Sequence, residues 1–298
     1  MKLNTFKSDF ILFFVASIWG LAFVAQRIGM DHVGPFTFNA FRFALGSASL
    51  LPVILFSKTK KQHFARKTDL VKAGFYSGIF LFCGISLQQI GLVYTTAGKA
   101  GFITGLYVVI VPFIGIFLKQ EKTSLNTWTG AILAAFGMFL LSVTKDLSIN
   151  KGDFLILLSA VCFAFHLIVI GRLSNKFNTA RLSLVQCIFC TFLSFCFAFI
   201  FENIVMQHVY NTIVPILYGG IFSVGVAYSL QIYGQRNSPA AHAAIIFSLE
   251  SVVAAFCGWL ILNELLTKRG MIGCSLMLAG MVISQLDKFK KNNVSLGN

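Results

Sequence analysis

Apolar segments of about 20 residues recur from end to end of this chain of 298 residues. Each is long enough to cross a hydrocarbon core of roughly 30 Å as an α-helix. In lipid every backbone N–H and C=O group needs a partner inside the protein, and a helix supplies these partners within one segment. The apolar runs show none of the two-residue alternation of a membrane β-barrel. The sequence therefore predicts an all-α membrane protein.

The predicted transmembrane helices number about ten, and only short loops marked by charge, Pro or Gly separate them. Only 11% of the residues are charged, whereas a soluble domain carries about 25%. So few charges could not cover a water-facing surface. We place the helices at residues 10–30, 36–56, 70–93, 97–118, 125–144, 153–172, 182–201, 213–234, 239–262 and 270–286.

The basic residues predict how the helices are oriented. The net charge is +14, which in a soluble protein would suggest nucleic acid as a partner. With the N-terminus in the cytoplasm, 17 of the 24 Lys and Arg residues fall on the cytoplasmic side, where positive charge concentrates in membrane proteins. We expect a multi-pass protein of the cytoplasmic (inner) membrane with both termini in the cytoplasm, and no nucleic-acid partner.

The two halves of the chain match each other at an offset of 143 residues. Ser86-Leu87-Gln88 is then aligned with Ser229-Leu230-Gln231. Asp9-Phe10 is aligned with Asp153-Phe154 at an offset of 144. Four aligned pairs of glycines support the match: Gly91 with Gly234, Gly115 with Gly258, Gly130 with Gly273, and Gly137 with Gly280.

This match predicts two repeats of about five helices each, at residues 1–146 and 147–290, followed by a short cytoplasmic tail at 291–298. An odd number of helices makes the second copy enter the membrane from the opposite side. The repeats are therefore expected to be inverted. Inverted repeats are typical of secondary transporters, whose substrate site lies near the midplane of the bilayer.

Several short motifs stand in a characteristic order along the chain. They are Trp19-Gly20, Pro35 followed by Arg42, Gly91–Ala97 leading into Gly101–Leu106 and Pro112, Leu249-Glu250-Ser251, and Glu121 with Glu264 at the ends of two helices. In this order they resemble the EamA-type members of the drug/metabolite transporter superfamily. The departures from the family pattern are Phe163-Ala164, in place of a second Trp-Gly, and Lys99, in place of a smaller polar residue.

The resemblance implies ten helices around a central cavity, lined by the first, third, fourth, sixth, eighth and ninth. It also implies transport of metabolites, often amino acids or similar compounds, without ATP hydrolysis.

Charged side chains are costly in a bilayer core, so each one in a predicted helix is a candidate for function. Glu250 lies near the centre of the helix at 239–262. A desolvated carboxyl group tends to take up a proton, so Glu250 could couple transport to protons or face a cationic group of the substrate. A structural role, in an ion pair or as a cap where the helix breaks, is the alternative.

Two arginines could hold a carboxylate of the substrate, because guanidinium binds it through two parallel hydrogen bonds. Arg42 lies within the second helix, and for it we favour a structural ion pair. Arg27 lies near the end of the first helix, where its side chain can reach the membrane interface instead.

Polar and aromatic side chains supply further candidates for substrate binding. Gln88 and Gln231 are aligned with each other, Tyr107 is aligned with Glu250, and Trp19 stands in the middle of the first helix. Aromatic walls with a few polar groups suit small organic ligands, especially cations. The alternative is ordinary packing in a bundle with 33 Phe residues.

Three basic side chains complete the set. His166 lies in the sixth helix, where a lone histidine is more often a hydrogen-bonding residue than a ligand. Lys99 and His242 are aligned with each other at the starts of the fourth and ninth helices. Their symmetry suggests two gates, one external and one internal.

We therefore expect a permease that moves a small polar metabolite by alternating access, with proton coupling an open option. The alternatives are a structural or assembly membrane protein without cargo and, less favoured, a membrane-embedded enzyme. The chain contains no H-E-x-x-H, no G-x-S-x-G and no phosphate-binding loop. The seven cysteines fall in apolar segments, where we expect them to act as small apolar side chains. The expected partners are the substrate and the lipid bilayer, with no cofactor or metal, and the protein is expected to be a monomer or homodimer.

Overall fold

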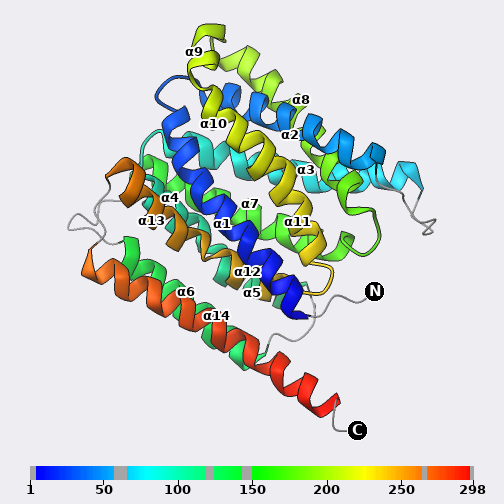
Figure 1. Ribbon diagram of the computed structural model, residues 1–298, viewed down its shortest axis with the longest axis vertical. Helices are drawn as coiled ribbons and strands as arrows, with labels where there is room; N and C mark the ends of the chain where they lie inside the picture. The colour runs from blue at the N-terminus through cyan, green and yellow to red at the C-terminus, as the bar shows by residue number, and fades with distance from the viewer. Residues whose placement is uncertain (1–4, 57–65, 119–123, 143–149, 264–266, 296–298) are drawn as a thin grey trace.

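The computed structural model describes residues 5–56, 66–118, 124–142, 150–263 and 267–295, which in these ranges form helices and turns without a strand (Figure 1). The helices are α1 (Thr5–Gly29), α2 (Pro35–Phe56), α3 (Lys67–Leu92), α4 (Ala97–Gly105), α5 (Tyr107–Phe117), α6 (Leu125–Ser142), α7 (Lys151–Leu173), α8 (Thr179–Phe201), α9 (Met206–Asn211), α10 (Ile213–Leu217), the π-helix η1 (Tyr218–Val226), α11 (Ala227–Gly234), α12 (Ala240–Phe247), α13 (Glu250–Leu262) and α14 (Lys268–Ser295).

Eight helical segments in the described ranges are long and apolar enough to cross a membrane. They correspond to eight of the ten predicted helices. The apolar part of α6, Leu125–Leu140, is shorter than these eight, and α14 is not among them. The chain is therefore a multi-pass membrane protein, whereas the count of ten transmembrane helices stays a prediction.

Three of the eight segments consist of more than one helix. Segment Ala97–Phe117 breaks at Leu106 between α4 and α5, and segment Ala240–Leu262 breaks between α12 and α13. Segment Ile213–Gly234 runs through α10, η1 and α11. The apolar pattern predicted the ends of these segments but not their interruptions, since neither break stands at a proline.

Helix α1 crosses the middle of the view in Figure 1 and packs against α11, α12 and α13. Helix α3 packs against α7 and α8, and α2 packs against α8 and η1. Elements from the two halves of the sequence therefore pack against each other, so the interior is shared between them.

Helices α6 and α14 run side by side along one flank of the molecule (Figure 1). Glycines allow this close approach, because a Cβ on Gly137 would lie 2.5 Å from the carbonyl oxygen of Gly273. A Cβ on Gly280 would likewise lie 2.7 Å from the carbonyl oxygen of Gly130. Small residues at such positions bring transmembrane helices into direct backbone contact.

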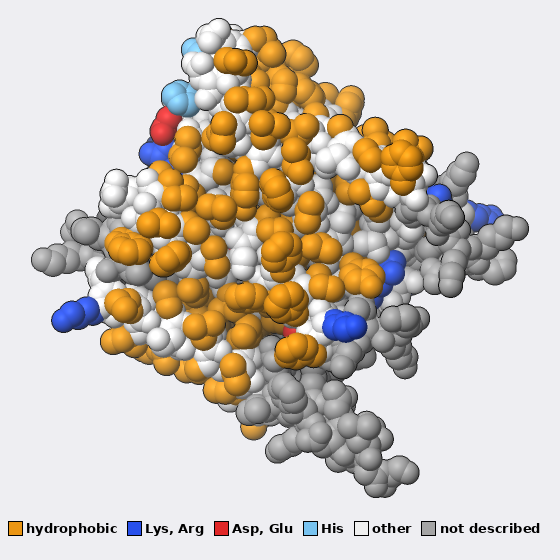
Figure 2. All heavy atoms as spheres, in the orientation of Figure 1, with side chains coloured by type: hydrophobic (Ala, Val, Ile, Leu, Met, Phe, Trp, Pro, Cys, Tyr) orange, Lys and Arg blue, Asp and Glu red, His pale blue; other side chains and the backbone are white. Residues whose placement is uncertain are grey.

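The outer surface is largely apolar. Figure 2 shows hydrophobic side chains over most of the face in view, with most of its charged side chains towards the margins. Large apolar side chains such as Phe56, Phe117 and Phe199 are exposed by 85%, 71% and 74%. An apolar surface this extensive marks a membrane-facing protein rather than a water-soluble monomer.

Polar caps fix several helix ends. Asn150 caps α7 in a capping box, in which its Oδ1 accepts from Asp153 N while Asp153 accepts from Asn150 N, both at 2.9 Å. The carboxylate of Glu202, at the end of α8, accepts from the backbone N–H groups of Phe36 and Thr37, each at 2.8 Å. Glu202 thus ties the start of α2 to the end of α8.

All seven cysteines are free and are buried or partly buried. Within the described residues no group of His, Cys, Asp and Glu has the arrangement of a metal site.

Candidate functional site

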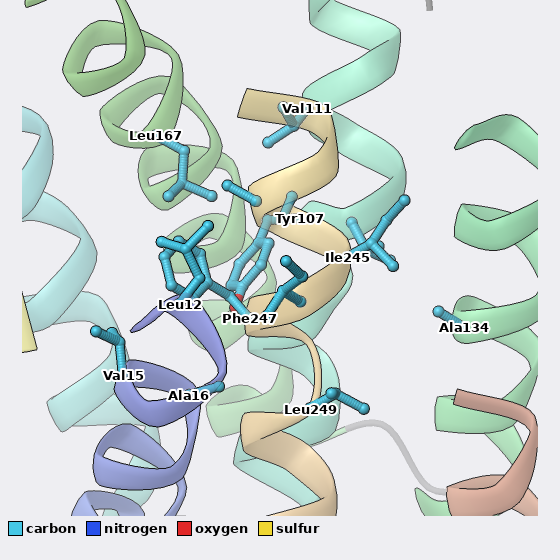
Figure 3. Packing of buried hydrophobic residues seen from close by; sticks show 14 of the residues in the cluster. Leu12, Val15, Ala16, Tyr107, Val111, Ala134, Leu167, Ile245, Phe247 and Leu249 are labelled. Atoms are coloured by element: carbon cyan, nitrogen blue, oxygen red, sulfur yellow. The ribbon is translucent and has the colours of Figure 1, made fainter. Parts of the chain in front are cut away.

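The two helix breaks meet inside the bundle. Tyr107 begins α5 after the first break, and Glu250 begins α13 after the second. The Tyr107 hydroxyl donates a hydrogen bond to Glu250 Oε1 at 2.8 Å, and each residue is only 3% exposed. Figure 3 shows the Tyr107 ring next to Phe247 among the buried apolar side chains around the breaks. Among the described residues, the Tyr107 side chain is the one that hydrogen-bonds this buried carboxyl group.

A cavity opens beside this hydrogen bond and contains about 520 Å³ of space free of protein atoms, a volume that includes space open to solvent. Its lining comes from α1, α2, α3, α4, α5, α7, η1, α11, α12 and α13: Trp19, Phe23, Gln26, Arg42, Ile85, Gln88, Thr104, Tyr107, Phe163, His166, Leu167, Ser223, Tyr228, Gln231, Phe247 and Glu250. Apart from α2, these elements belong to the first, third, fourth, sixth, eighth and ninth predicted helices, which are the six that the resemblance implied. Helix α2, the second predicted helix, adds Arg42 to the lining.

Aromatic rings form one wall of the cavity. The Trp19 ring centroid lies 5.2 Å from that of Tyr228 and 5.2 Å from that of Phe247. The indole N–H of Trp19 donates to the carbonyl oxygen of Ser223 at 3.1 Å. Ser223 belongs to the π-helix η1, a rare element that is frequent at functional sites. The π-helix thereby fixes the orientation of the Trp19 ring.

The polar side chains of the cavity are only partly satisfied. Gln88 Nε2 donates to Thr104 Oγ1 at 3.0 Å. His166 Nε2 lies 3.2 Å from Oε1 of Gln186, a residue of α8. Both amide atoms of Gln231 are buried without a hydrogen-bond partner. Gln231 can therefore both donate to and accept from a ligand. Such a bond would offset the cost of leaving a buried amide unpaired.

Arg42 lies in the same cavity lining and is 3% exposed. Its guanidinium lies over the rings of Phe38 and Phe43, 5.4 and 5.3 Å from their centroids. The ion pair that we favoured from the sequence is not found among the described residues, where Arg42 and Glu250 line one cavity without pairing. Arg27, by contrast, pairs with Asp31 at 2.8 Å on the exposed end of α1 and does not line the cavity.

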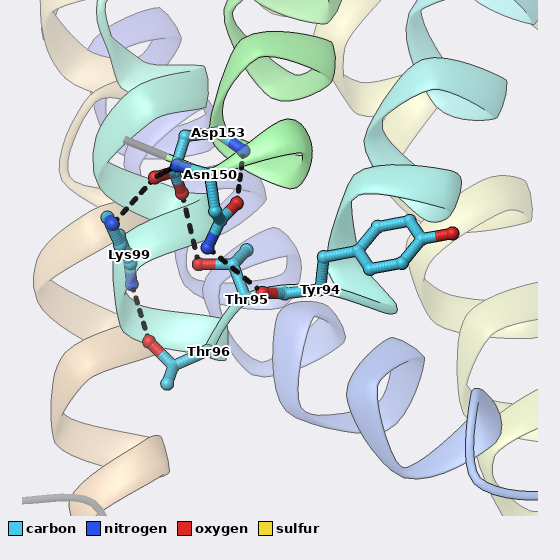
Figure 4. Close-up of polar contacts among 6 residues, drawn as sticks. All are labelled: Tyr94, Thr95, Thr96, Lys99, Asn150 and Asp153. Carbon is cyan, nitrogen blue, oxygen red and sulfur yellow. Dashed lines mark hydrogen bonds and ion pairs between the residues drawn. The ribbon is translucent and has the colours of Figure 1, made fainter. Parts of the chain in front are cut away.

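The two predicted gate residues each pair with an aspartate from the other half of the sequence. Lys99 Nζ, in α4, lies 2.6 Å from Oδ2 of Asp153 in α7 (Figure 4). Thr95 Oγ1 donates to Oδ1 of the same aspartate at 3.3 Å. His242 Nε2, in α12, lies 3.1 Å from Oδ1 of Asp9 in α1.

These two pairs lie towards opposite ends of α1. Asp9 stands in the second turn of α1, whereas Ala97 and Ala100, on either side of Lys99, pack near its other end with Val24 and Ile28. Asp9 and Val24 are 15 residues apart, which along a helix corresponds to about 22 Å. The cavity residues Trp19 and Phe23 belong to the stretch between the two pairs.

The structure therefore brings seven of the candidates together in the cavity lining: Trp19, Arg42, Gln88, Tyr107, His166, Gln231 and Glu250. Lys99 and His242 are not in the lining. Sequence reasoning missed Thr104, Ser223, Tyr228 and Phe247 as lining residues. It also missed Asp153 and Asp9 as the partners of Lys99 and His242, although the alignment of Asp9 with Asp153 could have indicated them. Glu121 and Glu264 lie outside the described residues.

Chemically, the cavity combines an aromatic wall with one carboxyl group, one guanidinium and several amide groups. It lacks a nucleophile–base pair or a metal cluster among the described residues. Such a lining is suited to binding a small organic molecule.

The comparisons with known proteins agree over the whole length. The model of the EamA-like transporter family matches this chain twice, over residues 6–143 and 150–285. An uncharacterized transporter of Archaeoglobus fulgidus is 33% identical over 279 residues, which cover 94% of this chain and 86% of that protein. The uncharacterized transporter YoaV of Bacillus subtilis is 21% identical over 276 residues, 91% of this chain and 94% of YoaV. One solved crystal structure, 17% identical in sequence, has the same fold with a TM-score of 0.78 over 94% of this chain and 96% of that one.

Proposed function

The chain belongs to the EamA-like transporter family, and on that basis we propose that it is a secondary transporter of a small polar metabolite, such as an amino acid or a related compound. It works by alternating access in the cytoplasmic membrane, with both termini in the cytoplasm. The observation that carries the proposal is the cavity at the two helix breaks, lined from both halves of the chain. Discontinuous helices around a central site are the usual way in which such transporters bind a substrate.

Inverted repeats are part of this proposal, and reciprocal contacts support them. Tyr107 and Glu250, which bond to each other, are 143 residues apart, the offset that aligns the two halves of the sequence. A residue that contacts its own symmetry mate lies on the symmetry axis. We therefore place the pseudo-two-fold axis at the Tyr107–Glu250 hydrogen bond, inside the cavity.

The two ion pairs also correspond under the repeat. Lys99 is aligned with His242 at the offset of 143, and Asp9 with Asp153 at the offset of 144. Each pair joins a broken-helix segment of one repeat to the first helix of the other. In alternating access one pair separates to admit the substrate while the other keeps the opposite side closed. We assign the Lys99–Asp153 pair to the external gate and the His242–Asp9 pair to the internal gate.

Proton coupling forms the last part of the proposal and rests on Glu250. A charged carboxylate is costly in a buried apolar site, so exchange of a proton there is a natural step as the cavity changes sides. Glu250→Gln keeps an acceptor for the Tyr107 hydroxyl but cannot exchange a proton. The variant is therefore expected to keep the fold and to lose the pH dependence of transport.

Counterflow in proteoliposomes tests the function. The purified protein is reconstituted and screened with labelled amino acids, nucleosides, vitamins and quaternary amines, with Glu250→Gln as the variant. Asp69→Asn, at an exposed residue in the first turn of α3, is the matched control.

Accumulation of one class of compound by wild type and Asp69→Asn, with altered pH dependence in Glu250→Gln, supports the proposal. If transport by Glu250→Gln keeps the full pH dependence of the wild type, Glu250 is not the site of proton coupling. Failure of the folded protein to exchange any compound in the panel would favour a role without transport.

A further inference from the structure

Arg42 is a charged residue in the interior of a membrane protein and forms no ion pair with any of the described residues. It stands in the second turn of α2 and is 97% buried, since only 3% of it is exposed. A guanidinium in such a place is costly unless a counter-charge or several hydrogen bonds compensate for it. In the part of the chain that the structure describes, Arg42 forms neither an ion pair nor a hydrogen bond, and its Nε is buried without an acceptor.

Its immediate surroundings compensate for the charge only in part. The rings of Phe38 and Phe43, on the same helix, attract the guanidinium through their π faces. On the other side η1 approaches closely, where a Cβ added to Gly219 would lie 3.4 Å from Arg42 Cδ. This packing limits how far the side chain can move out of the cavity lining. Neither contact supplies a negative charge.

The cavity that Arg42 lines has further unused hydrogen-bonding capacity. Gln231 has a free amide donor and acceptor, and Gln26 Oε1 is likewise buried without a partner. Glu250 Oε1 already accepts from Tyr107, and the carboxyl group does not pair with Arg42. Among the described residues, the Arg42 guanidinium is therefore left without a carboxylate in contact with it.

We propose that Arg42 binds a carboxylate group of the substrate and that the apolar body of the substrate lies against Trp19, Tyr228 and Phe247. This inference rests on the proposed transport function and narrows the substrate to small organic carboxylates with an apolar part. A planar guanidinium holds a carboxylate through two parallel hydrogen bonds, a geometry that fixes its orientation. Gln231, in the same cavity lining, has an unpaired amide N–H that can donate to the ligand.

A carboxylate fits this lining better than a phosphate. A phosphate group carries close to two negative charges near neutral pH. The cavity offers a single guanidinium and already contains the carboxyl group of Glu250. Eight of the sixteen lining residues are aromatic or aliphatic, which also favours a ligand with one compact charged group and an apolar remainder.

Binding of matched pairs of compounds to the purified protein in detergent tests the inference. Phenylacetate, 3-phenylpropanoate, phenylalanine and 4-methylpentanoate are each compared with the corresponding primary amide by isothermal titration calorimetry. In each pair the two compounds have nearly the same shape, and the acid carries a carboxylate where the amide is neutral. Wild-type protein is expected to bind at least one acid about tenfold or more tightly than its amide, the scale of hydrogen bonds to charged groups.

Two variants identify Arg42 as the source of the preference. Arg42→Gln is expected to bind acid and amide equally, and Arg42→Lys to keep part of the preference because it retains the charge but not the planar fork. Arg27→Gln, which removes an exposed arginine that pairs with Asp31, is the matched control and keeps the wild-type preference. The comparison of acid with amide uses wild-type protein, so it remains a test even if a variant fails to fold.

The outcomes separate this inference from the transport proposal. Wild-type protein that binds none of the acids better than its amide, or Arg42→Gln that keeps the preference, overturns the role of Arg42. If the protein exchanges an amine in counterflow and binds no acid more tightly than its amide, the transport proposal is supported and the carboxylate site is contradicted. Arg42-dependent binding of an acid that the reconstituted protein does not exchange supports the site and contradicts transport of that acid.

Discussion

Tyr107 Oη lies 2.8 Å from Glu250 Oε1, and the two residues are 143 positions apart, the offset at which the two halves of the sequence align. Both stand at the first position of a helix that follows a break in a membrane-spanning segment. This hydrogen bond thus joins the two broken segments beside the cavity. If the axis of the repeats passes through this bond, opening towards either side must rearrange the contacts around it, while the cavity remains at the same depth.

Removing the tyrosine hydroxyl is expected to destabilise the protein. Tyr107→Phe leaves the buried Glu250 carboxyl group without its partner, which costs about 1–3 kcal/mol. We expect a lower midpoint of thermal unfolding in detergent and slower counterflow. Tyr210→Phe, at a residue 71% exposed, is the control and should unfold like the wild type. Equal unfolding midpoints for Tyr107→Phe and the control would mean that the bond does not support the fold.

The Lys99–Asp153 pair is expected to act as one unit in transport. Lys99→Met and Asp153→Asn each break the contact at 2.6 Å. Because either change removes the same interaction, the double variant should slow counterflow by less than the product of the two single effects. The measurement is the counterflow rate of all four proteins. Effects that multiply would indicate that the two side chains act independently.

His242 is expected to support transport through its contact with Asp9. In His242→Gln an amide N–H can still reach the Asp9 carboxylate, whereas His242→Ala leaves that carboxylate without this partner. Counterflow by the glutamine variant should therefore exceed that of the alanine variant several-fold. Similar rates for the two variants would show that the hydrogen bond plays no part in gating.

The glycines between α6 and α14 are expected to set how closely these helices pack. Gly137→Ala and Gly280→Ala each place a Cβ under 3 Å from a backbone carbonyl oxygen of the facing helix. Overpacking of this kind costs about 1–3 kcal/mol. Gly115→Ala is the matched control, since no atom lies within 4 Å of its added Cβ. We expect lower unfolding midpoints for the first two variants only, and an equal fall in Gly115→Ala would contradict the packing argument.

Much of the fold could be predicted because long apolar segments have few alternatives in lipid. The eight segments that could span a membrane lie close to the predicted ranges. The helix breaks were not predictable in the same way, because Leu106 and Ser248-Leu249 carry no local signal such as proline. Those breaks are stabilised by contacts between residues far apart in sequence.

The candidate site was predictable to the extent that repeat symmetry constrained it. Aligning the two halves of the sequence paired Tyr107 with Glu250 and Lys99 with His242 as candidates. The same alignment paired Asp9 with Asp153, the two aspartates that contact the predicted gate residues. The place of Arg42 in the cavity was not predictable, because it depends on the packing of α2 against η1. Gly220 permits that packing, since its Cβ would lie 2.9 Å from the carbonyl oxygen of Arg42.

Reversible cross-linking at each ion pair tests alternating access most directly. In a chain whose seven native cysteines are replaced, cysteines are introduced at positions 99 and 153 or at positions 9 and 242. A reducible bifunctional thiol reagent then joins each pair in proteoliposomes. The account predicts that either cross-link stops counterflow and that reduction restores it. Counterflow at the full rate through protein completely cross-linked at either pair would contradict it.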